Sequence, residues 1–535
     1  MNKPLTKTRI ARPILAVVAC LAAALVMSVA PAPASAFDLA SRVVEHRLDN
    51  GMLFLLVRRT QAPVFSGYIR FRVGGADEPA GASGVAHLFE HMAFKGTTRI
   101  GIKDLEGERP VLAEMDTVGD ELAGLLVKGD KQTPEEARRA EALTKRMLEL
   151  RDKHKPLLVK DELSRLYLRN GAVGLNATTS KDLTSYFVNL PANRFKLWAL
   201  LEADRLAHPV LREFWSEKDV VMEERRMRVE SNPGGKLYEA FVQAAYPVGD
   251  PYHAPTVGTW ADLRALTAAK AREFHAAHYT PENAVGALVG DFELEAAKDL
   301  LSRTFGVIPA RKAAPPPPPA KPRQSKAERR VQVPFDAQPA VMIGFHKPNA
   351  PHRDDYVADV LHDLLTHGRT ARLNKALVQE QGVVTRVGSY GAPGHRRPNL
   401  LVFRLSPRHP HTTADAESAL YAELDRLKTE PVGEAELNKV RTRVEASFLR
   451  GLDTNSGLAS QLTYFQSTVG DWRYVATHPD VLATITAADI QTFAKTYLNA
   501  DNRVVATLVP AAKPPAAAEV PTAAKGAEAA KAVTP

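Results

Sequence analysis

The apolar and polar positions near the start of the chain predict a strand that leads into a short helix. Residues 68–73 (YIRFRV) have the composition of a strand, and glycines follow at 74, 75 and 81. Ser83 is a good candidate for the N-cap of the next helix. That helix carries apolar side chains that can pack it into a core, namely Val85, Leu88, Phe89 and Met92. A strand that passes through glycines into a packed helix is a rigid frame for chemistry.

Residues 216–227 predict a helix with acidic residues on its inner face. Ser216 can cap this helix. Helical spacing places four of its residues on one face, namely Val220, Val221, Glu224 and Met227. Glu217 lies seven residues before Glu224 and therefore points the same way, toward the apolar stripe. Glu223 is rotated by about 100° from Glu224 and is expected nearer to solvent.

The segment 101–173 predicts an inserted helical hairpin. Its first half has apolar residues at helical spacing, namely Val111, Leu112, Met115, Val118, Leu122 and Leu125. Thr133 to Glu136 form a capping box with proline at the first helical position, which predicts the start of a second helix.

An internal repeat predicts two homologous α+β domains. Residues 266–285 have counterparts in 485–504 at a constant offset of 219, and each copy is a helix followed by a strand. We expect an N-terminal domain at 37–310 and a homologous C-terminal domain at 331–510. Residues 311–330 between them contain five consecutive prolines and predict a stiff linker. The Ala/Pro/Lys-rich tail, 511–535, has the composition of a disordered segment.

Composition and the first 36 residues point to an exported protein. Residues 1–36 combine four basic residues, an apolar run and a small-residue site ending at Ala36, which predicts a cleaved signal peptide. The alternatives are an uncleaved membrane anchor, for which the apolar run is short, and lipid attachment at Cys20, beyond which that run continues. Cleavage would lower the formal net charge from +9 to +5, with no basic cluster that indicates nucleic-acid binding. Cys20 is the one cysteine of the sequence, so the mature chain has neither a disulfide nor a thiol nucleophile, and we expect a periplasmic or secreted location.

The pentamer HLFEH at 87–91 carries the chemistry. His87 and His91 are four residues apart, so on a helix they share a face and can hold one metal ion. Glu90 lies next to His91, where it can act as a base on a water molecule activated by that metal. The pattern is the inverted zinc-peptidase motif H-x-x-E-H. The alternative is a helix with ordinary surface histidines.

A zinc site of this kind needs a third protein ligand, usually a carboxylate. An inward glutamate is costly to bury without a cation, which favours Glu224 as that ligand. The alternative, an exposed helix with Glu–Arg pairs, is the interpretation we accept for Glu223 and its arginine neighbours. His208 and His253 have no partner at metal-ligand spacing and are expected to be structural.

Three segments together resemble the insulinase/pitrilysin family of zinc metallopeptidases, and in particular its bacterial two-domain, processing-peptidase-like members. They are 75–96 (GADEPAGASGVAHLFEHMAFKG), 217–225 (EKDVVMEER) and 174–180 (GLNATTS). The resemblance implies that Glu224 ligates zinc and that Glu217 supports a zinc-binding histidine. It also implies that a substrate lies along the third segment, at Asn176 and Ala177, although Asn176 is equally suited to a turn. The 133 residues from His91 to Glu224 exceed the family's usual gap, and the predicted hairpin accounts for the excess.

The resemblance further implies that each domain is an antiparallel-rich mixed sheet covered by helices and that two such domains make half of a clamshell. A complete chamber then requires a dimer, either a homodimer or a heterodimer with a related subunit that lacks the metal motif. The expected function is Zn²⁺-dependent endopeptidase activity on peptides or short unfolded polypeptides, with Glu90 as the general base. The alternatives are a non-catalytic assembly subunit with the same fold and a periplasmic solute-binding protein, which needs no zinc helix.

Overall fold

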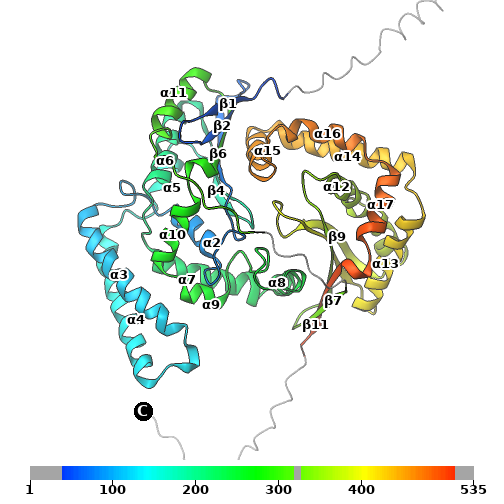
Figure 1. Ribbon diagram of the computed structural model, residues 1–535, viewed down its shortest axis with the longest axis horizontal. Coiled ribbons are helices and arrows are strands. Elements are labelled where there is room, and N and C mark those ends of the chain that lie inside the picture. The colour runs from blue at the N-terminus through cyan, green and yellow to red at the C-terminus, as the bar shows by residue number, and fades with distance from the viewer. Residues whose placement is uncertain (1–38, 319–326, 512–535) are drawn as a thin grey trace, which may run out of the picture.

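The computed structural model describes residues 39–318 and 327–511 of the 535-residue chain. The predicted signal peptide and the predicted tail, apart from Ala511, lie outside these ranges. Within them the chain folds into two halves, each built on one sheet (Figure 1). No helix in the described ranges is long and apolar enough to span a membrane.

The first sheet has the strand order β1-β2-β6-β3-β5-β4. Its neighbours are antiparallel except for β2 and β6, which are parallel. The strands are β1 (Val44–Arg47), β2 (Leu53–Arg58), β3 (Val64–Phe71), β4 (Val173–Thr179), β5 (Thr184–Pro191) and β6 (Ala284–Gly290).

The second sheet repeats this arrangement without a counterpart of β1. Its order is β7-β11-β8-β10-β9, with β7 and β11 parallel and the other neighbours antiparallel. The strands are β7 (Arg329–Phe335), β8 (Ala340–Lys347), β9 (Val384–Ala392), β10 (Asn399–Pro407) and β11 (Arg503–Pro510). The predicted α+β fold with two homologous domains is therefore confirmed. Strand β7 begins at Arg329 and so includes the last two residues of the expected linker, 311–330.

Helices surround both sheets. Those of the first half are α2 (Val85–Met92), α3 (Leu105–Leu126), α4 (Pro134–His154), α5 (Glu162–Arg169), α6 (Phe195–Ala207), α7 (Phe214–Arg225), α8 (Pro233–Ala245), α9 (Trp260–Ala265), α10 (Ala268–His278) and α11 (Leu294–Thr304). Those of the second half are α12 (Arg353–Thr366), α13 (Thr413–Thr429), α14 (Glu434–Asp453), α15 (Asn455–Thr468), α16 (Tyr474–Ala483) and α17 (Ala487–Tyr497). Short 3₁₀ or π turns are η1 (Gly129–Lys131), η2 (Lys155–Leu157), η3 (Ala192–Arg194), η4 (Arg226–Glu230), η5 (Pro281–Asn283), η6 (Asn374–Glu380) and η7 (Ala500–Asn502).

The repeat found in the sequence is visible in the elements. Helix α10 and strand β6 correspond to α17 and β11, and each helix is capped by a threonine hydroxyl, from Thr267 and from Thr486. The predicted helical hairpin is also present. Helices α3 and α4 pack along each other and extend away from the second half (Figure 1), and Thr133 and Glu136 form the expected capping box.

Two helices are exchanged between the halves. Helix α15 of the second half covers one face of the first sheet, where its Leu458 and Leu462 pack with Leu55 and Val289 (Figure 1). Helix α8 of the first half covers one face of the second sheet, in the same cluster as Met342 and Val402. Each sheet is thus buried on both faces only because the other half supplies a helix, so the halves depend on each other for their cores.

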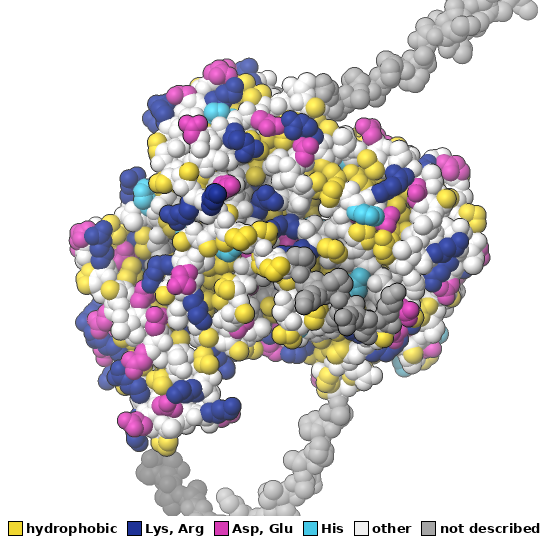
Figure 2. Space-filling model, viewed as in Figure 1, with side chains coloured by type: hydrophobic (Ala, Val, Ile, Leu, Met, Phe, Trp, Pro, Cys, Tyr) yellow, Lys and Arg dark blue, Asp and Glu magenta, His cyan; other side chains and the backbone are white. Residues whose placement is uncertain are grey.

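No single sign of charge dominates the face of the molecule that Figure 2 draws. On the face drawn in Figure 2, basic and acidic side chains are intermixed, including over the α3–α4 pair. This agrees with the modest net charge of the sequence and with the absence of a basic cluster in it.

Candidate metal centre

Helix α2 carries the HLFEH pentamer and begins differently from the prediction. Ser83 does not cap the helix, because its hydroxyl donates to Asp262 and accepts from the backbone N–H of Thr259. Gly84, at φ 94°, is the N-cap, a conformation that suits glycine. Glu78 supplies the cap instead. Its two carboxylate oxygens accept the N–H groups of Gly84 and Ala86, both at 2.9 Å, and so hold the first turn of the helix.

Helix α7 brings the third side chain. It begins after Glu213 at Phe214, so the expected cap at Ser216 is wrong. Val220 and Met227 are exposed rather than inward, at 43% and 57%, whereas Val221 is buried and packs in the core with α2. As expected, Glu217 is buried and Glu223 is exposed.

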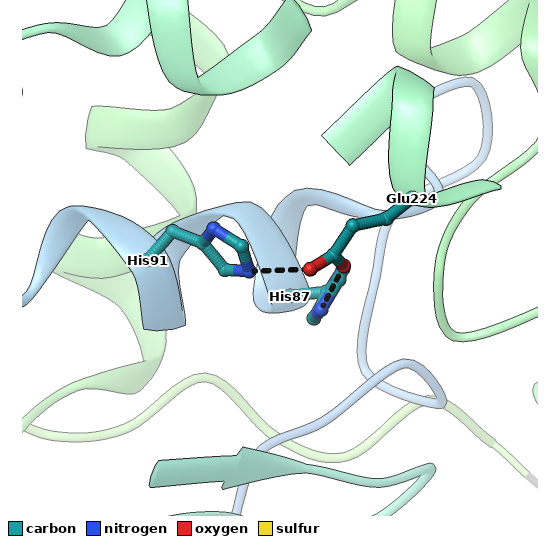
Figure 3. A group of neighbouring side chains, drawn as sticks. All are labelled: His87, His91 and Glu224. Carbon is teal, nitrogen blue, oxygen red and sulfur yellow. Dashed lines mark ion pairs between the residues drawn. The ribbon is translucent and has the colours of Figure 1, made fainter. Parts of the chain in front are cut away.

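The structure brings His87, His91 and Glu224 together (Figure 3). Nε2 of His87 lies 3.4 Å from Oε2 of Glu224, and Nε2 of His91 lies 3.9 Å from Oε1 of the same carboxylate. A tetrahedral zinc ion with bonds of about 2.0–2.1 Å requires ligand atoms roughly 3.4 Å apart. Among the described residues, no other group of three His, Cys, Asp or Glu side chains converges in this way.

The two imidazoles differ in their environment. Burial lowers the pKa of His87 to about 3, with smaller contributions from His91 and Arg228, so this ring is neutral at neutral pH. The hydrogen bond from His91 Nδ1 to Glu217, at 3.3 Å, raises the pKa of His91 above its ordinary value. When His91 donates through Nδ1, the lone pair of Nε2 points toward Glu224 and is available to a metal.

Glu217 is held in place by Lys95, whose Nζ lies 2.6 Å from Oε1. Burial opposes the ionisation of Glu217, but the hydrogen bonds from His91 and Lys95 outweigh it and lower the pKa of this carboxyl. Glu217 therefore stays ionised and accepts the hydrogen bond of the His91 ring.

The donor set fits a divalent zinc ion. Two neutral imidazoles and one carboxylate are ordinary zinc ligands that leave a fourth position open. Oε2 of Glu224 is buried and accepts no hydrogen bond from the described residues, and Arg228 comes no nearer than 3.5 Å, so a bound cation would supply the close partner that this oxygen lacks.

Glu90 lies between His87 and His91 in sequence and is half-buried. Burial raises the pKa of Glu90 above its ordinary value, and the nearby Glu224 acts in the same direction. A raised pKa suits a carboxylate that first takes and then gives a proton.

Strand β4 lies at the free edge of the first sheet and packs against α2. Asn176 is exposed on this strand, while Ala177 is buried in the core. Ala177 can therefore contact a ligand only through its backbone. His208 bonds Asp204 at 3.0 Å and His253 bonds the carbonyl of Tyr246 at 2.8 Å, so neither belongs to the centre.

Three residues of the centre escaped the sequence analysis. Lys95 lies four positions after His91, so helical spacing could have indicated it. Arg228, whose Nη2 lies 3.5 Å from Oε2 of Glu224, follows that glutamate by four positions, so the same spacing could have indicated it. Glu78 caps α2 from a loop, which helical periodicity could not reveal.

Comparisons with known proteins identify a family. The family model described as insulinase (peptidase family M16) matches residues 54–107, and the model described as peptidase M16 inactive domain matches residues 265–444. The chain belongs to the M16 peptidase family. Its M16 relatives include the zinc protease PqqE of Helicobacter pylori, which is 27% identical over 73% of this chain and 76% of its own. They also include an uncharacterized zinc protease of Mycobacterium leprae, which is 23% identical over 80% of this chain and 83% of its own.

Solved structures share the M16 fold. A protease from Helicobacter pylori superposes with a TM-score of 0.72 at 23% identity, covering 88% of this chain and 99% of that one. The periplasmic protease PqqL from Escherichia coli gives a TM-score of 0.63 at 16% identity and covers 88% of this chain but 47% of that one. These similarities show the fold, and the chemistry of this chain must be argued from its own residues.

Proposed function

We propose that the chain is a zinc-dependent endopeptidase. The observation that carries the proposal is the convergence of His87, His91 and Glu224 from two helices, with Glu90 beside them in an H-x-x-E-H sequence. Further support comes from relatives named zinc proteases.

In the proposed site, His87, His91 and Glu224 hold the ion and Glu217 orients His91. When bound, zinc supplies a Lewis acid that polarises the scissile carbonyl and acidifies a water molecule. Glu90 takes the proton from the attacking water and delivers it to the leaving amine nitrogen. Its burial favours the first transfer, because it keeps the pKa of Glu90 above the ordinary range and so makes the carboxylate a stronger base.

The proposed substrate is an extended peptide or a short unfolded polypeptide. Among the described strands, none pairs with the outer edge of β4 next to α2, so a peptide can add to the sheet there through backbone hydrogen bonds. The exposed Asn176 and the backbone of Ala177 would lie along it. Such pairing requires no particular side chain, so we expect broad sequence selectivity.

We also propose that two chains enclose the substrate, either as a homodimer or with a related subunit that lacks the metal motif. The proposed location is the periplasm, which is supported by the leader-like sequence and by the periplasmic protease among the structural neighbours.

The test is the Glu90→Gln variant beside Glu223→Gln, a matched change at an exposed glutamate. Hydrolysis of an unstructured peptide should fall by about 10²–10⁴-fold in Glu90→Gln, while zinc content stays near that of the unchanged chain. Glu223→Gln should behave like the unchanged chain. Undiminished, chelator-sensitive hydrolysis by Glu90→Gln would refute the general base. A zinc-loaded chain that cleaves no peptide, alone or with a second subunit, would favour the alternative of a non-catalytic assembly subunit.

A further inference from the structure

The second half contains a cavity at the position that the metal centre occupies in the first half. Helix α12 packs against α14 and β9 as α2 packs against α7 and β4. An offset of 272 aligns Val357 and Ala358 of α12 with Val85 and Ala86 of α2. The same offset places Asp359 at the position of His87. The cavity beside this helix has a volume of about 350 Å³.

The walls of this C-terminal cavity combine carboxylates with aromatic rings. Asp355 and Asp359 project from adjacent turns of α12, while Tyr464 of α15 and Tyr474 of α16 line other sides. The volume falls within the range of about 300–1,000 Å³ that is usual for small-ligand pockets. Aromatic faces and carboxylates together suit an organic cation.

The two carboxylates are not equivalent. Asp355 is neutralised, because it pairs with Lys347 and accepts the backbone N–H of Ala350 at 3.1 Å. Asp359 makes no hydrogen bond or ion pair with the described residues, although its side chain is accessible from the cavity. Enclosure by the surrounding protein and the nearby Asp355 raise the pKa of Asp359 to about 7. Lys347 acts in the opposite direction but is paired with Asp355, so Asp359 has no cation of its own.

The histidines of the cavity do not supply that cation. Burial lowers the pKa of His362, His395 and His478, so these rings are neutral near pH 7. Asn399, which also lines the cavity, has a buried side-chain oxygen with no donor among the described residues. The lining thus offers an uncompensated negative charge and a free acceptor, both of which suit a group with several N–H donors.

The cavity is connected to the proposed substrate strand. His395 lines the cavity, and its backbone N–H donates to Asp182 at 2.6 Å. Asp182 lies three residues after the end of β4. The neighbouring Arg396 bonds Asp77 at 3.1 Å, in the loop that leads to α2. A peptide bound at the end of β4 therefore passes close to the cavity wall.

We propose that the C-terminal cavity binds an ammonium or guanidinium group of the peptide, with Asp359 as its counter-ion. The nature of the ligand rests on the proposed peptidase function. Two sources share this chemistry, a Lys or Arg side chain and a free N-terminal amine. The site would add a preference for basic substrates to the loose backbone recognition of β4.

The test measures peptide binding by calorimetry in the Glu90→Gln background at pH 8, where Asp359 is ionised. An N-acetylated peptide with one arginine is compared with the same peptide containing neutral citrulline. A third peptide has citrulline and a free N-terminus, and it separates the two sources of positive charge. At least one charged peptide should bind about tenfold more tightly than the acetylated citrulline peptide.

Asp359→Asn should abolish this discrimination, and Asp425→Asn, at an exposed aspartate of α13, should retain it. Equal affinity for all three peptides, or discrimination that survives Asp359→Asn, would overturn the proposal. Because binding is measured without turnover, a failure of catalysis is seen separately: hydrolysis by the unchanged chain tests the proposed function, and the arginine–citrulline difference tests the cavity.

Discussion

In the first half, α2 packs against α7 beside β4, and in the second half α12 packs against α14 beside β9. The offset of 272 places Asp363 where the first half has His91, and the offset of 219 places Arg443 where it has Glu224. In the first half these positions approach each other as imidazole and carboxylate, 3.9 Å apart. In the second half, Nε of Arg443 lies 2.6 Å from Oδ2 of Asp363.

The difference shows how one scaffold can satisfy the same pair of positions in two ways. Two imidazoles and a carboxylate offer three electron-pair donors that a divalent ion can bind together. A guanidinium and a carboxylate neutralise each other, so the second pair needs no ion and can be purely structural. Glu217 and its counterpart Glu436 differ in the same way. Glu217 bonds His91, a candidate metal ligand, whereas Glu436 bonds an arginine, Arg372.

The largest effect is expected at Glu224. In Glu224→Gln a neutral amide replaces the charged ligand, so zinc affinity should fall by more than about 100-fold, beyond the effect of losing a supporting residue. Zinc per chain after dialysis, measured by mass spectrometry of the metal, checks this. Glu223→Gln should keep its zinc. If Glu224→Gln retained the metal as firmly as this control, Glu224 would not be a metal ligand, and the proposed difference between the two halves would be wrong.

Arg443→Met tests the second half of the comparison. It leaves Asp363, at 8% side-chain exposure, with only the 3.6 Å contact to Nδ1 of His367, so the free energy of unfolding should fall by about 2–3 kcal/mol, less than for a fully buried pair because Arg443 is about a quarter exposed. Denaturant unfolding measures the change. The double variant with Asp363→Asn should recover most of the loss. Zinc content should not change, and a loss of zinc would mean that the pair supports the metal centre after all.

Glu217→Gln and Glu436→Gln test whether a second pair of equivalent positions has different roles in the two halves. Without the charge of Glu217, His91 is less firmly oriented, so zinc affinity or hydrolysis should fall by about 10–100-fold. Glu436→Gln should leave both unchanged, since its partner is an arginine remote from the ligands. Equal losses in the two variants, measured by metal titration and peptide cleavage, would indicate a general effect on folding.

Local patterns in the sequence predicted the elements of the centre, whereas long-range contacts decided its details. The spacing of His87, Glu90 and His91 within one helical turn predicted them as site residues. The cost of burying an unpaired charge predicted Glu224. Ser83 was a plausible cap, but Asp262, 179 residues away, takes its hydroxyl. An apolar stripe likewise predicts that a helix is buried without saying against which sheet, so the exchange of α8 and α15 could not be foreseen.

The smallest effect concerns this exchange of helices. Gly344 on β8 faces α8, and a Cβ at this position would lie 2.5 Å from Cζ of Phe241. Gly344→Ala should therefore push α8 from the second sheet and lower the free energy of unfolding by about 1–2 kcal/mol. Gly388→Ala on β9, where a Cβ meets no atom within 4 Å, is the matched control and should change it by less than about 0.5 kcal/mol. Denaturant unfolding of both variants checks the difference. If they were equally stable, the contact of α8 with the second sheet would not contribute to the core, and the two halves would be more independent than their shared helices indicate.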